Sequence, residues 1–157
     1  MIGFEVAQLF KNCKCGQMMS VDLRRLVFAR KVWISHVPVY ACQDCSLYEL
    51  LPLLKADLVC YISSLGDVKQ RMQVSFADIY EPASVLRDVL ASSSDSLLEF
   101  QHRCKVAFDD RINQLLDLYR VAQLECDTEW MAEITTRLKK MTAFVQLQNE
   151  YLDFCAS

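Results

Sequence analysis

The sequence predicts a mostly α-helical protein with a small β zinc ribbon at its N-terminal end, followed by helices that finish in a long antiparallel helical hairpin. Three observations predict this class. Two close cysteine pairs bracket a stretch rich in Val, Ile, Trp and Tyr within the first 45 residues, the 157 residues include only three glycines and three prolines, and residues 83–157 contain neither. Few helix breakers favour long helices, and paired cysteines suit a metal-stapled module.

The composition is that of a chain that folds around a core. Hydrophobic residues make up 53% and charged residues 24%, a balance that argues against intrinsic disorder. Lys55 and Asp57 interrupt the most apolar region, so no run reaches the roughly 18 to 20 apolar residues of a membrane span. The first residues lack the basic segment and apolar stretch of a secretory signal, and we therefore expect a cytoplasmic protein without a membrane partner.

The first module is predicted to hold one structural Zn²⁺ ion. Zinc prefers four soft ligands in a tetrahedron, and cysteines one or two residues apart can bind one ion from a tight turn. Gly16 directly follows the first pair, where a glycine allows the backbone to turn toward sulfur. The predicted ligands are Cys13, Cys15, Cys42 and Cys45. Because Cys-x-Cys is tighter than the usual Cys-x-x-Cys, His36 is an alternative ligand in place of Cys13.

Two other interpretations of the cysteine pairs stay open. Cys42 and Cys45 have a redox spacing, although no parallel strand is expected before them, and all four could be ordinary buried cysteines. Four protein ligands would leave no position for a water molecule, so we expect a protein that is not an enzyme. The isolated cysteines are predicted to be small buried hydrophobic residues; they are Cys60, Cys104, Cys126 and Cys155.

The segment between the pairs predicts short antiparallel strands over residues 21–28 and 31–40, because β-branched and aromatic residues suit a pleated surface. The formal net charge is −3, but residues 1–40 hold six basic and two acidic side chains, which gives +4 there and −7 in the remainder. Basic and aromatic side chains together could contact nucleic acid or a protein partner. The candidates are Arg24, Arg25, Arg30, Lys31 and Trp33.

A helix is predicted over residues 46–66, with Pro52 in its first turn and Gly66 as its C-terminal cap. Residues 69–76 predict a short strand or an extended connection, and residues 77–91 a short helix. Residues 92–95, of sequence SSSD, are expected to be a capping junction or a small linker.

The last part of the chain predicts two long amphipathic helices that form an antiparallel hairpin. Asp127 lies three residues before Trp130 and is expected to cap the second helix where the chain reverses. Apolar residues at helical spacing mark each buried face. In the first helix they are Leu97, Leu98, Cys104, Phe108, Ile112, Leu115, Leu116, Tyr119 and Ala122, and in the second Trp130, Ile134, Leu138, Met141, Val145, Gln148 and Tyr151.

These elements predict three parts. Residues 1–50 form the zinc-ribbon module, residues 51–92 form connecting helices with a short extended segment, and residues 93–157 form the helical hairpin.

Two segments resemble known families. Residues 13–51, with CKCG, the approach Val37-Pro38-Val39 and the second pair in ACQDCSLYELL, resemble the YgiT-type zinc fingers of bacterial regulators and toxin-antitoxin proteins. Residues 111–141, a leucine-rich helix, an aspartate turn, an aromatic residue and a second helix with basic residues, are similar to the IDEAL domain of Firmicutes. Together the two resemblances imply a small bacterial protein.

The sequence therefore leads us to expect a non-enzymatic zinc-binding regulatory or adaptor protein. It would act through protein-protein interaction or self-association by its C-terminal helices. The alternative is a DNA-binding transcriptional regulator of antitoxin type that uses the basic zinc ribbon.

Overall fold

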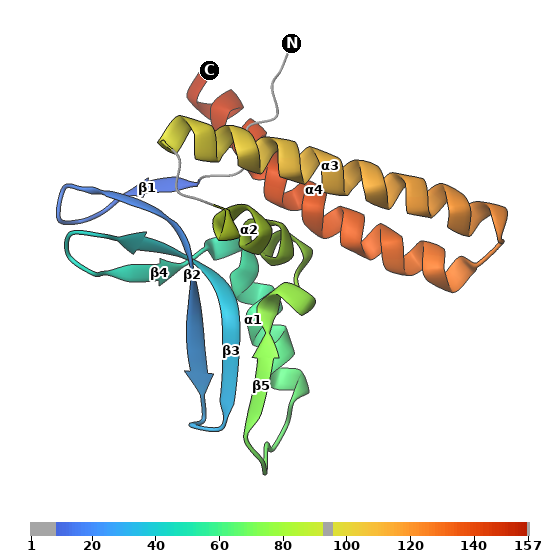
Figure 1. The fold of residues 1–157 in the computed structure, drawn as a ribbon, viewed down its shortest axis with the longest axis horizontal. Coiled ribbons are helices and arrows are strands. Elements are labelled where there is room, and N and C mark those ends of the chain that lie inside the picture. Colours follow the sequence, from blue (N-terminus) through green and yellow to red (C-terminus); the bar gives the residue numbers. More distant parts are fainter. Residues whose placement is uncertain (1–8, 93–95, 157) are drawn as a thin grey trace. The chain divides into compact units, whose positions relative to one another are not determined.

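The computed structural model describes residues 9–92 and 96–156, together with the side chains of these residues other than 97 and 146–156 (Figure 1). Contacts group the chain into a sheet-and-helix unit, Gln8–Leu90, and a helical unit that begins at Ala91.

The first unit is built on a curled sheet (Figure 1). Four strands follow one another in antiparallel order and curl into a half-barrel, and a fifth strand adds parallel to the third. The strands are β1 (Phe10–Asn12), β2 (Met18–Phe28), β3 (Val32–Cys42), β4 (Tyr48–Leu50) and β5 (Met72–Ser75). The two long central strands, of 11 residues each, therefore carry the sheet.

One edge of β3 is shared between two partners. Residues 32–35 pair with β5 and residues 39–41 with β4, while β2 pairs along the other edge. Between these regions, Arg24 pairs with Val37 and Leu26 with Ile34, so β3 has one residue more than β2. His36 takes a left-handed φ of 58° at this bulge. The extra residue shifts the alternation of side chains between the two faces of the sheet by one position. Ile34 and Val37, an odd number of residues apart, are therefore both fully buried.

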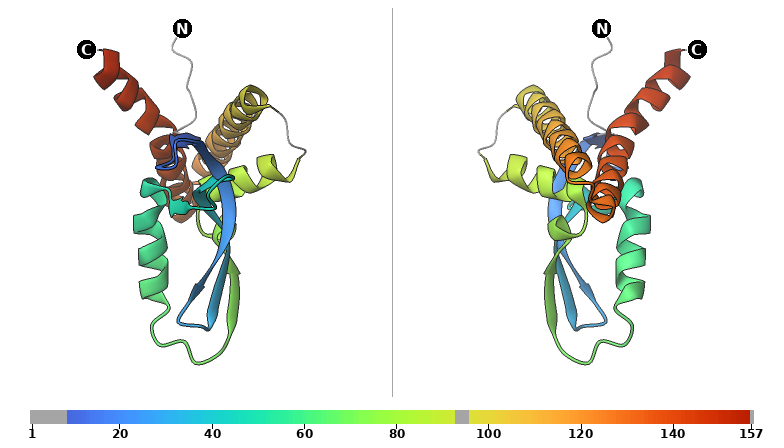
Figure 2. Two further views of the ribbon diagram at one scale, coloured as in Figure 1. Left: turned by 90° about the vertical axis from the view of Figure 1, so that its left-hand side faces the viewer. Right: turned by 90° about the vertical axis from the view of Figure 1, so that its right-hand side faces the viewer.

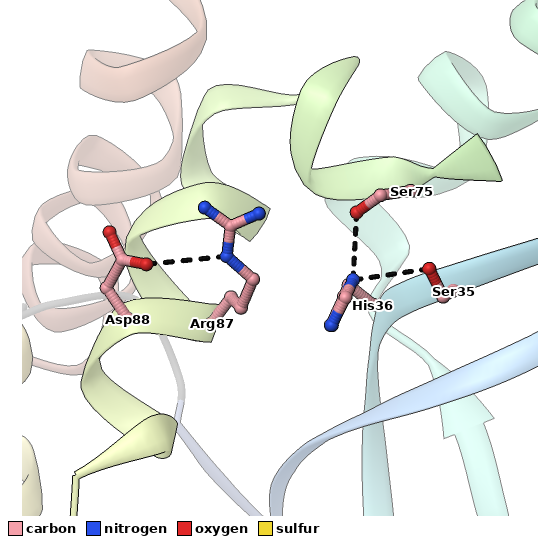
Figure 3. A network of polar contacts seen from close by, with 5 residues as sticks. All are labelled: Ser35, His36, Ser75, Arg87 and Asp88. Atoms are coloured by element: carbon pink, nitrogen blue, oxygen red, sulfur yellow. Dashed lines mark hydrogen bonds and ion pairs between the residues drawn. The ribbon is translucent and has the colours of Figure 1, made fainter.

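His36 joins the bulge to the end of β5 (Figure 3). Its Nδ1 lies 2.8 Å from the Ser75 hydroxyl and 3.2 Å from the Ser35 hydroxyl. The Ser35 hydroxyl also donates to the Val74 carbonyl at 3.2 Å. These contacts fasten a strand of only four residues to the sheet, which is a structural role for the histidine.

Helix α1 (Pro52–Ser64) runs along one face of the sheet (Figure 2) and buries Leu54 and Leu58. As predicted, its first residue is a proline, and Gly66 follows its end with φ +59°. The turn η1 (Phe76–Asp78) then leads into helix α2 (Glu81–Ala91). The rings of Phe76 and Tyr80 stack there with their centroids 5.4 Å apart.

The second unit is a pair of long helices, α3 (Leu97–Leu124) and α4 (Thr128–Ala156). Asp127 Oδ1 accepts a hydrogen bond from the Trp130 backbone N–H at 3.0 Å, so the predicted cap is confirmed. Between the helices, the rings of Phe108 and Phe144 stack with centroids 5.1 Å apart. Two residues predicted on the buried face of the first helix, Leu98 and Leu116, are instead 79% and 42% exposed. The predicted stripe residues Leu97, Gln148 and Tyr151 lie outside the described side chains, and residues 93–95 of the predicted junction lie outside the described residues.

The predicted fold class is wrong. The chain does not form a small zinc ribbon followed by a helical hairpin, because its strands extend far beyond the cysteine turns and curl into a half-barrel. Residues 48–50, predicted as helix, form β4, and β5 returns to pair with β3. The sequence showed local strand and helix preferences but carried no signal for this return, which pairs residues 40 positions apart.

The isolated cysteines also differ from expectation. Cys104 is fully buried, as predicted, whereas Cys60 and Cys126 are exposed. Cys60 lies on the exposed side of α1, and Cys126 lies in the turn between α3 and α4 with a left-handed φ of 54°. Cys155 lies outside the described side chains.

Candidate metal centre

Two hairpin loops bring the four paired cysteines to one end of the sheet. The first loop joins β1 to β2 and carries Cys13 and Cys15, and the second joins β3 to β4, with Cys42 as the last residue of β3 and Cys45 in the loop itself. Met19 pairs directly with Cys42 across β2 and β3, so the register of the two long strands sets the loops side by side.

The two loops have the same hydrogen-bond frame at different lengths. In the first, the backbone N–H of Cys13 donates to the Gln17 carbonyl at 2.7 Å, four residues on. In the second, the N–H of Cys42 donates to the Leu47 carbonyl at 2.9 Å, five residues on. The shorter loop therefore accommodates Cys-x-Cys where the longer one has Cys-x-x-Cys, and the unusual spacing is a one-residue contraction of the same turn.

The residue after the second cysteine of each loop adopts a left-handed conformation. Gly16 has φ +92° and Ser46 has φ 60°. The left-handed region suits glycine because it lacks a Cβ, whereas serine must accept some strain there. Sequence reasoning identified Gly16 but missed Ser46, since only its place after Cys45, matching that of Gly16 after Cys15, could have indicated it.

The four sulfur atoms form one compact cluster. They all lie within 4.8 Å of one another, with Cys13 Sγ 3.4 Å from Cys45 Sγ and Cys15 Sγ 3.6 Å from Cys42 Sγ. A disulfide would require about 2.05 Å, and these cysteines are free thiols. A ZnS₄ tetrahedron with bonds of about 2.3 Å has edges of roughly 3.8 Å, so one metal ion fits among the four sulfurs.

Backbone amides point at the sulfurs and change their acidity. The N–H of Cys45, helped by that of Asp44, lowers the pKa of Cys42 to about 7 although burial opposes this. The N–H of Gln17 lowers the pKa of Cys15, but the Cys13 thiol, burial and the other two thiols together raise it to about 12. The pKa of Cys45 is also raised, because the neighbouring thiols Cys13 and Cys42 outweigh the N–H of Leu47.

This pattern of pKa shifts suits a site that binds a cation. The lowered pKa of Cys42 favours its thiolate, whereas the raised pKa values of Cys15 and Cys45 disfavour further thiolates within 4.8 Å of it. A bound divalent ion would supply the missing positive charge and allow all four to ionise. The four predicted ligands are thus brought together, and they could hold a metal ion.

The alternative ligand is placed elsewhere in the fold. His36 belongs to the bulge in the middle of β3 and contacts Ser35 and Ser75, and it is not part of the sulfur cluster. Cys13, the ligand that the short spacing had put in question, is itself a member of the cluster.

The five basic and aromatic candidates are divided by the structure. Arg24 forms an ion pair with Asp22 at 3.2 Å, and Lys31 donates to the Val68 carbonyl at 3.2 Å. Arg25 is exposed, Arg30 lies in the turn after β2, and Trp33 contacts Arg71. Sequence reasoning missed Arg71, because its proximity to Trp33 depends on the pairing of β5 with β3.

The comparisons with known proteins add no relative. No protein-family model, curated protein or solved structure matches this chain. Among the described residues, no helix combines the length and the apolar character that crossing a membrane requires.

Proposed function

We propose that this chain is a non-enzymatic zinc-binding regulatory or adaptor protein that acts through protein-protein contacts. The observation that carries the proposal is the closed set of four sulfurs from two hairpin loops, all within 4.8 Å. Four thiolate ligands complete a zinc tetrahedron and leave no position for water or substrate, which is the arrangement of a structural site.

Zinc is the metal that this ligand set favours. Thiolates are soft ligands, and a tetrahedral S₄ set is typical of zinc or of iron-sulfur chemistry. All four sulfurs lie within 4.8 Å of one another, which fits a single ion and is less than the span across an Fe–S cluster with several metal atoms. The four ligands lie in hairpin loops rather than in a cofactor cavity, which also suits a single ion.

The ion would stabilise the curled end of the sheet. Each cysteine pair belongs to a loop between a long central strand and an edge strand of three residues. Strands this short have few ladder hydrogen bonds, so a crosslink between their loops would hold both edges in place. Cys13 and Cys42 are buried, which anchors the loops in the core.

The helical unit offers the surface for a partner. Its inward residues bury a core around Phe108, yet α3 also carries large apolar side chains on its solvent side, with Leu124 84% and Leu116 42% exposed. Exposed apolar side chains at helical spacing suit contact with another protein or a second copy of this chain. Further residues of this kind are Leu98, Val106, Leu118 and Val121.

Metal analysis tests the first half of the proposal. Protein purified without chelator should contain about one zinc per chain, and replacement by Co²⁺ should give the visible absorption of a tetrahedral thiolate site. Cys42→Ser should lose both signals, whereas Cys60→Ser, a change at an exposed cysteine outside the cluster, should keep them. Zinc-free protein with unchanged stability would contradict the proposal.

The helical surface is tested by a charge substitution. We expect Leu116→Glu with Leu124→Glu to abolish self-association or partner retention, and the matched exposed change Asn113→Glu to have no effect. Light scattering over a range of concentrations measures the oligomeric state, and a partner is sought with the wild type and both variants in parallel. Equal behaviour of all three proteins would count against this surface.

A further inference from the structure

The half of the sheet remote from the cysteine loops has two unlike faces. On one, Val32 and Ile34 are fully buried. On the other, Val27 on β2, Trp33 on β3 and Gln73 on β5 form one row, because Trp33 is the direct register partner of both neighbours. Val27 is 54% exposed and Gln73 is also exposed, so this face is open to solvent.

Arg25 and Arg71 extend the same face. Alternate residues of a strand point to the same side, which places Arg25 beside Val27 and Arg71 beside Gln73. The Arg71 guanidinium lies 5.5 Å from the centre of the Trp33 ring, which confirms the placement of Arg71. We call these five residues, Arg25, Val27, Trp33, Arg71 and Gln73, the Trp33 face.

The charge on and around the Trp33 face has one sign. Residues 24–33 and 69–73 contain six basic side chains and no acidic one. Arg24 belongs to the opposite side of β2, where Asp22 pairs with it at 3.2 Å. The other five basic residues lie on the Trp33 face or at its rim; they are Arg25, Arg30, Lys31, Lys69 and Arg71. This excess of positive charge is complementary to a polyanion.

The turn at the end of this half is strained. Ala29 and Arg30 both have positive φ, 52° and 58°, at the central positions of a β-turn that the Lys31 N–H closes on the Phe28 carbonyl at 3.1 Å, where glycine or asparagine is favoured. Strained backbone conformations concentrate at functional sites. Here the turn sets Arg30 at the tip of the hairpin, next to the Trp33 face.

The metal centre lies at the other end of the same two strands. The β2–β3 ladder runs from the pair Met19–Cys42 beside the sulfur cluster to the pair Phe28–Val32 beside the turn. A ligand on the Trp33 face would therefore not approach the metal, and the two sites can be tested separately.

We propose that the Trp33 face binds single-stranded nucleic acid, with an unpaired base on the Trp33–Arg71 pair and backbone phosphates on Arg25 and the basic rim. Aromatic rings and guanidinium planes are the surfaces on which unpaired bases stack, and basic side chains follow the phosphates. A duplex hides its base faces within its own stack, so a ring lying in a sheet surface favours the single strand. This inference is independent of the partner surface on the helices.

Tryptophan fluorescence tests the stacking directly. The chain has two tryptophans, and Trp130→Phe leaves Trp33 as the sole reporter in the full-length, zinc-loaded protein. We expect a 20-mer of deoxythymidine to quench this fluorescence on titration. Fluorescence anisotropy of a labelled 20-mer should give the same Kd. A plot of the logarithm of the association constant against the logarithm of the salt concentration should have a slope of about −0.7 for each phosphate contacted.

Neighbouring arginines on opposite sides of one strand give a matched control. Arg25→Gln and Arg71→Gln should each weaken binding about tenfold and make the salt slope shallower, whereas Arg24→Gln should leave the Kd within about twofold. All three changes remove one charge from an exposed side chain, so a general charge effect would weaken them equally.

Several results would overturn the proposal. They are equal losses for Arg24→Gln and Arg25→Gln, anisotropy changes without quenching of Trp33, and a duplex bound as tightly as the single strand. Vesicles of phosphatidylcholine and phosphatidylserine at 4:1 provide another polyanionic surface. Binding to these vesicles with the same dependence on Arg25, in the absence of binding to the oligonucleotide, would assign the face to a membrane surface instead.

Discussion

Lys11 Nζ lies 2.8 Å from Glu49 Oε2, and this ion pair joins β1 to β4, the two ends of the four-strand antiparallel order. The Lys11 ammonium also lies 6.0 Å from the centre of the Tyr40 ring on β3. Strands that are separated by two others in a flat sheet could not make this contact. The pair is therefore a direct consequence of the curl.

Glu49→Gln should lower the free energy of unfolding by no more than about 1 kcal/mol. Both side chains of the pair are 44% exposed, and solvent-exposed ion pairs contribute little after solvent screening. Urea unfolding at low and high salt measures the effect, which should shrink at high salt. If the free energy of unfolding fell by several kcal/mol, the ion pair rather than the burial of apolar side chains would be what stabilises the curl.

Tyr40 should make the protein lose stability at alkaline pH. Burial, helped by the Glu49 carboxylate, raises the pKa of Tyr40 from 10 to about 12. Because the folded pKa is the higher one, the contribution is complete below pH 10 and is lost as the pH rises to about 12. The loss should amount to about 2 to 3 kcal/mol.

Tyr40→Phe should flatten this alkaline slope, as measured by urea unfolding at pH 9 to 12. Tyr48→Phe, at a tyrosine that is 54% exposed, serves as the matched control and should leave the slope unchanged. Identical slopes in all three proteins would show that other groups cause the alkaline loss.

Ala29→Gly should stabilise the protein by about 0.5 to 1 kcal/mol. Ala29 has φ 52°, a conformation that costs a residue with a Cβ but not glycine. The matched change Ala132→Gly, at an exposed position within α4, should destabilise it by a similar amount because glycine is a poor helix former. Relative to the wild type, the denaturation midpoint should therefore rise for Ala29→Gly and fall for Ala132→Gly. Midpoints that move in the same direction would contradict the turn geometry.

Metal removal should destabilise the sheet unit and depend on pH. Thiolates bind metal and thiols do not, so protons compete with the ion and its affinity should fall as the pH falls. We expect a chelator to lower the melting temperature of the wild type and of Cys60→Ser, and to have no further effect on Cys45→Ser. A wild-type melting temperature that does not respond to chelator at neutral or acidic pH would contradict a stabilising ion.

Much of the local structure could be predicted from residue types and spacing. Asp127 was identified as a helix cap from its spacing to Trp130, and Gly66 marked the end of α1, whereas the predicted start at residue 46 lies six residues before the observed one. The cysteine pairs also indicated their own cluster, because each pair needs only one tight turn. These signals are short-range, and neighbouring residues determine them.

The curl of the sheet could not be predicted in the same way. The return of β5 to β3 depends on residues 40 positions apart, and the intervening helix is consistent with many arrangements. For the same reason Arg71 was not grouped with Trp33, and Glu49 was assigned to a helix rather than opposite Lys11.

The sequence by itself determined that the four paired cysteines cluster, the helix ends that Gly66 and Asp127 mark, and the presence of antiparallel strands between the cysteine pairs. Tertiary structure alone decided that the strands curl, that Cys13 and Cys45 meet across two loops, and that the basic residues divide between opposite faces. The physical reason is that turn and capping preferences arise within a few residues, whereas register and curvature are set by packing between segments that are distant along the chain.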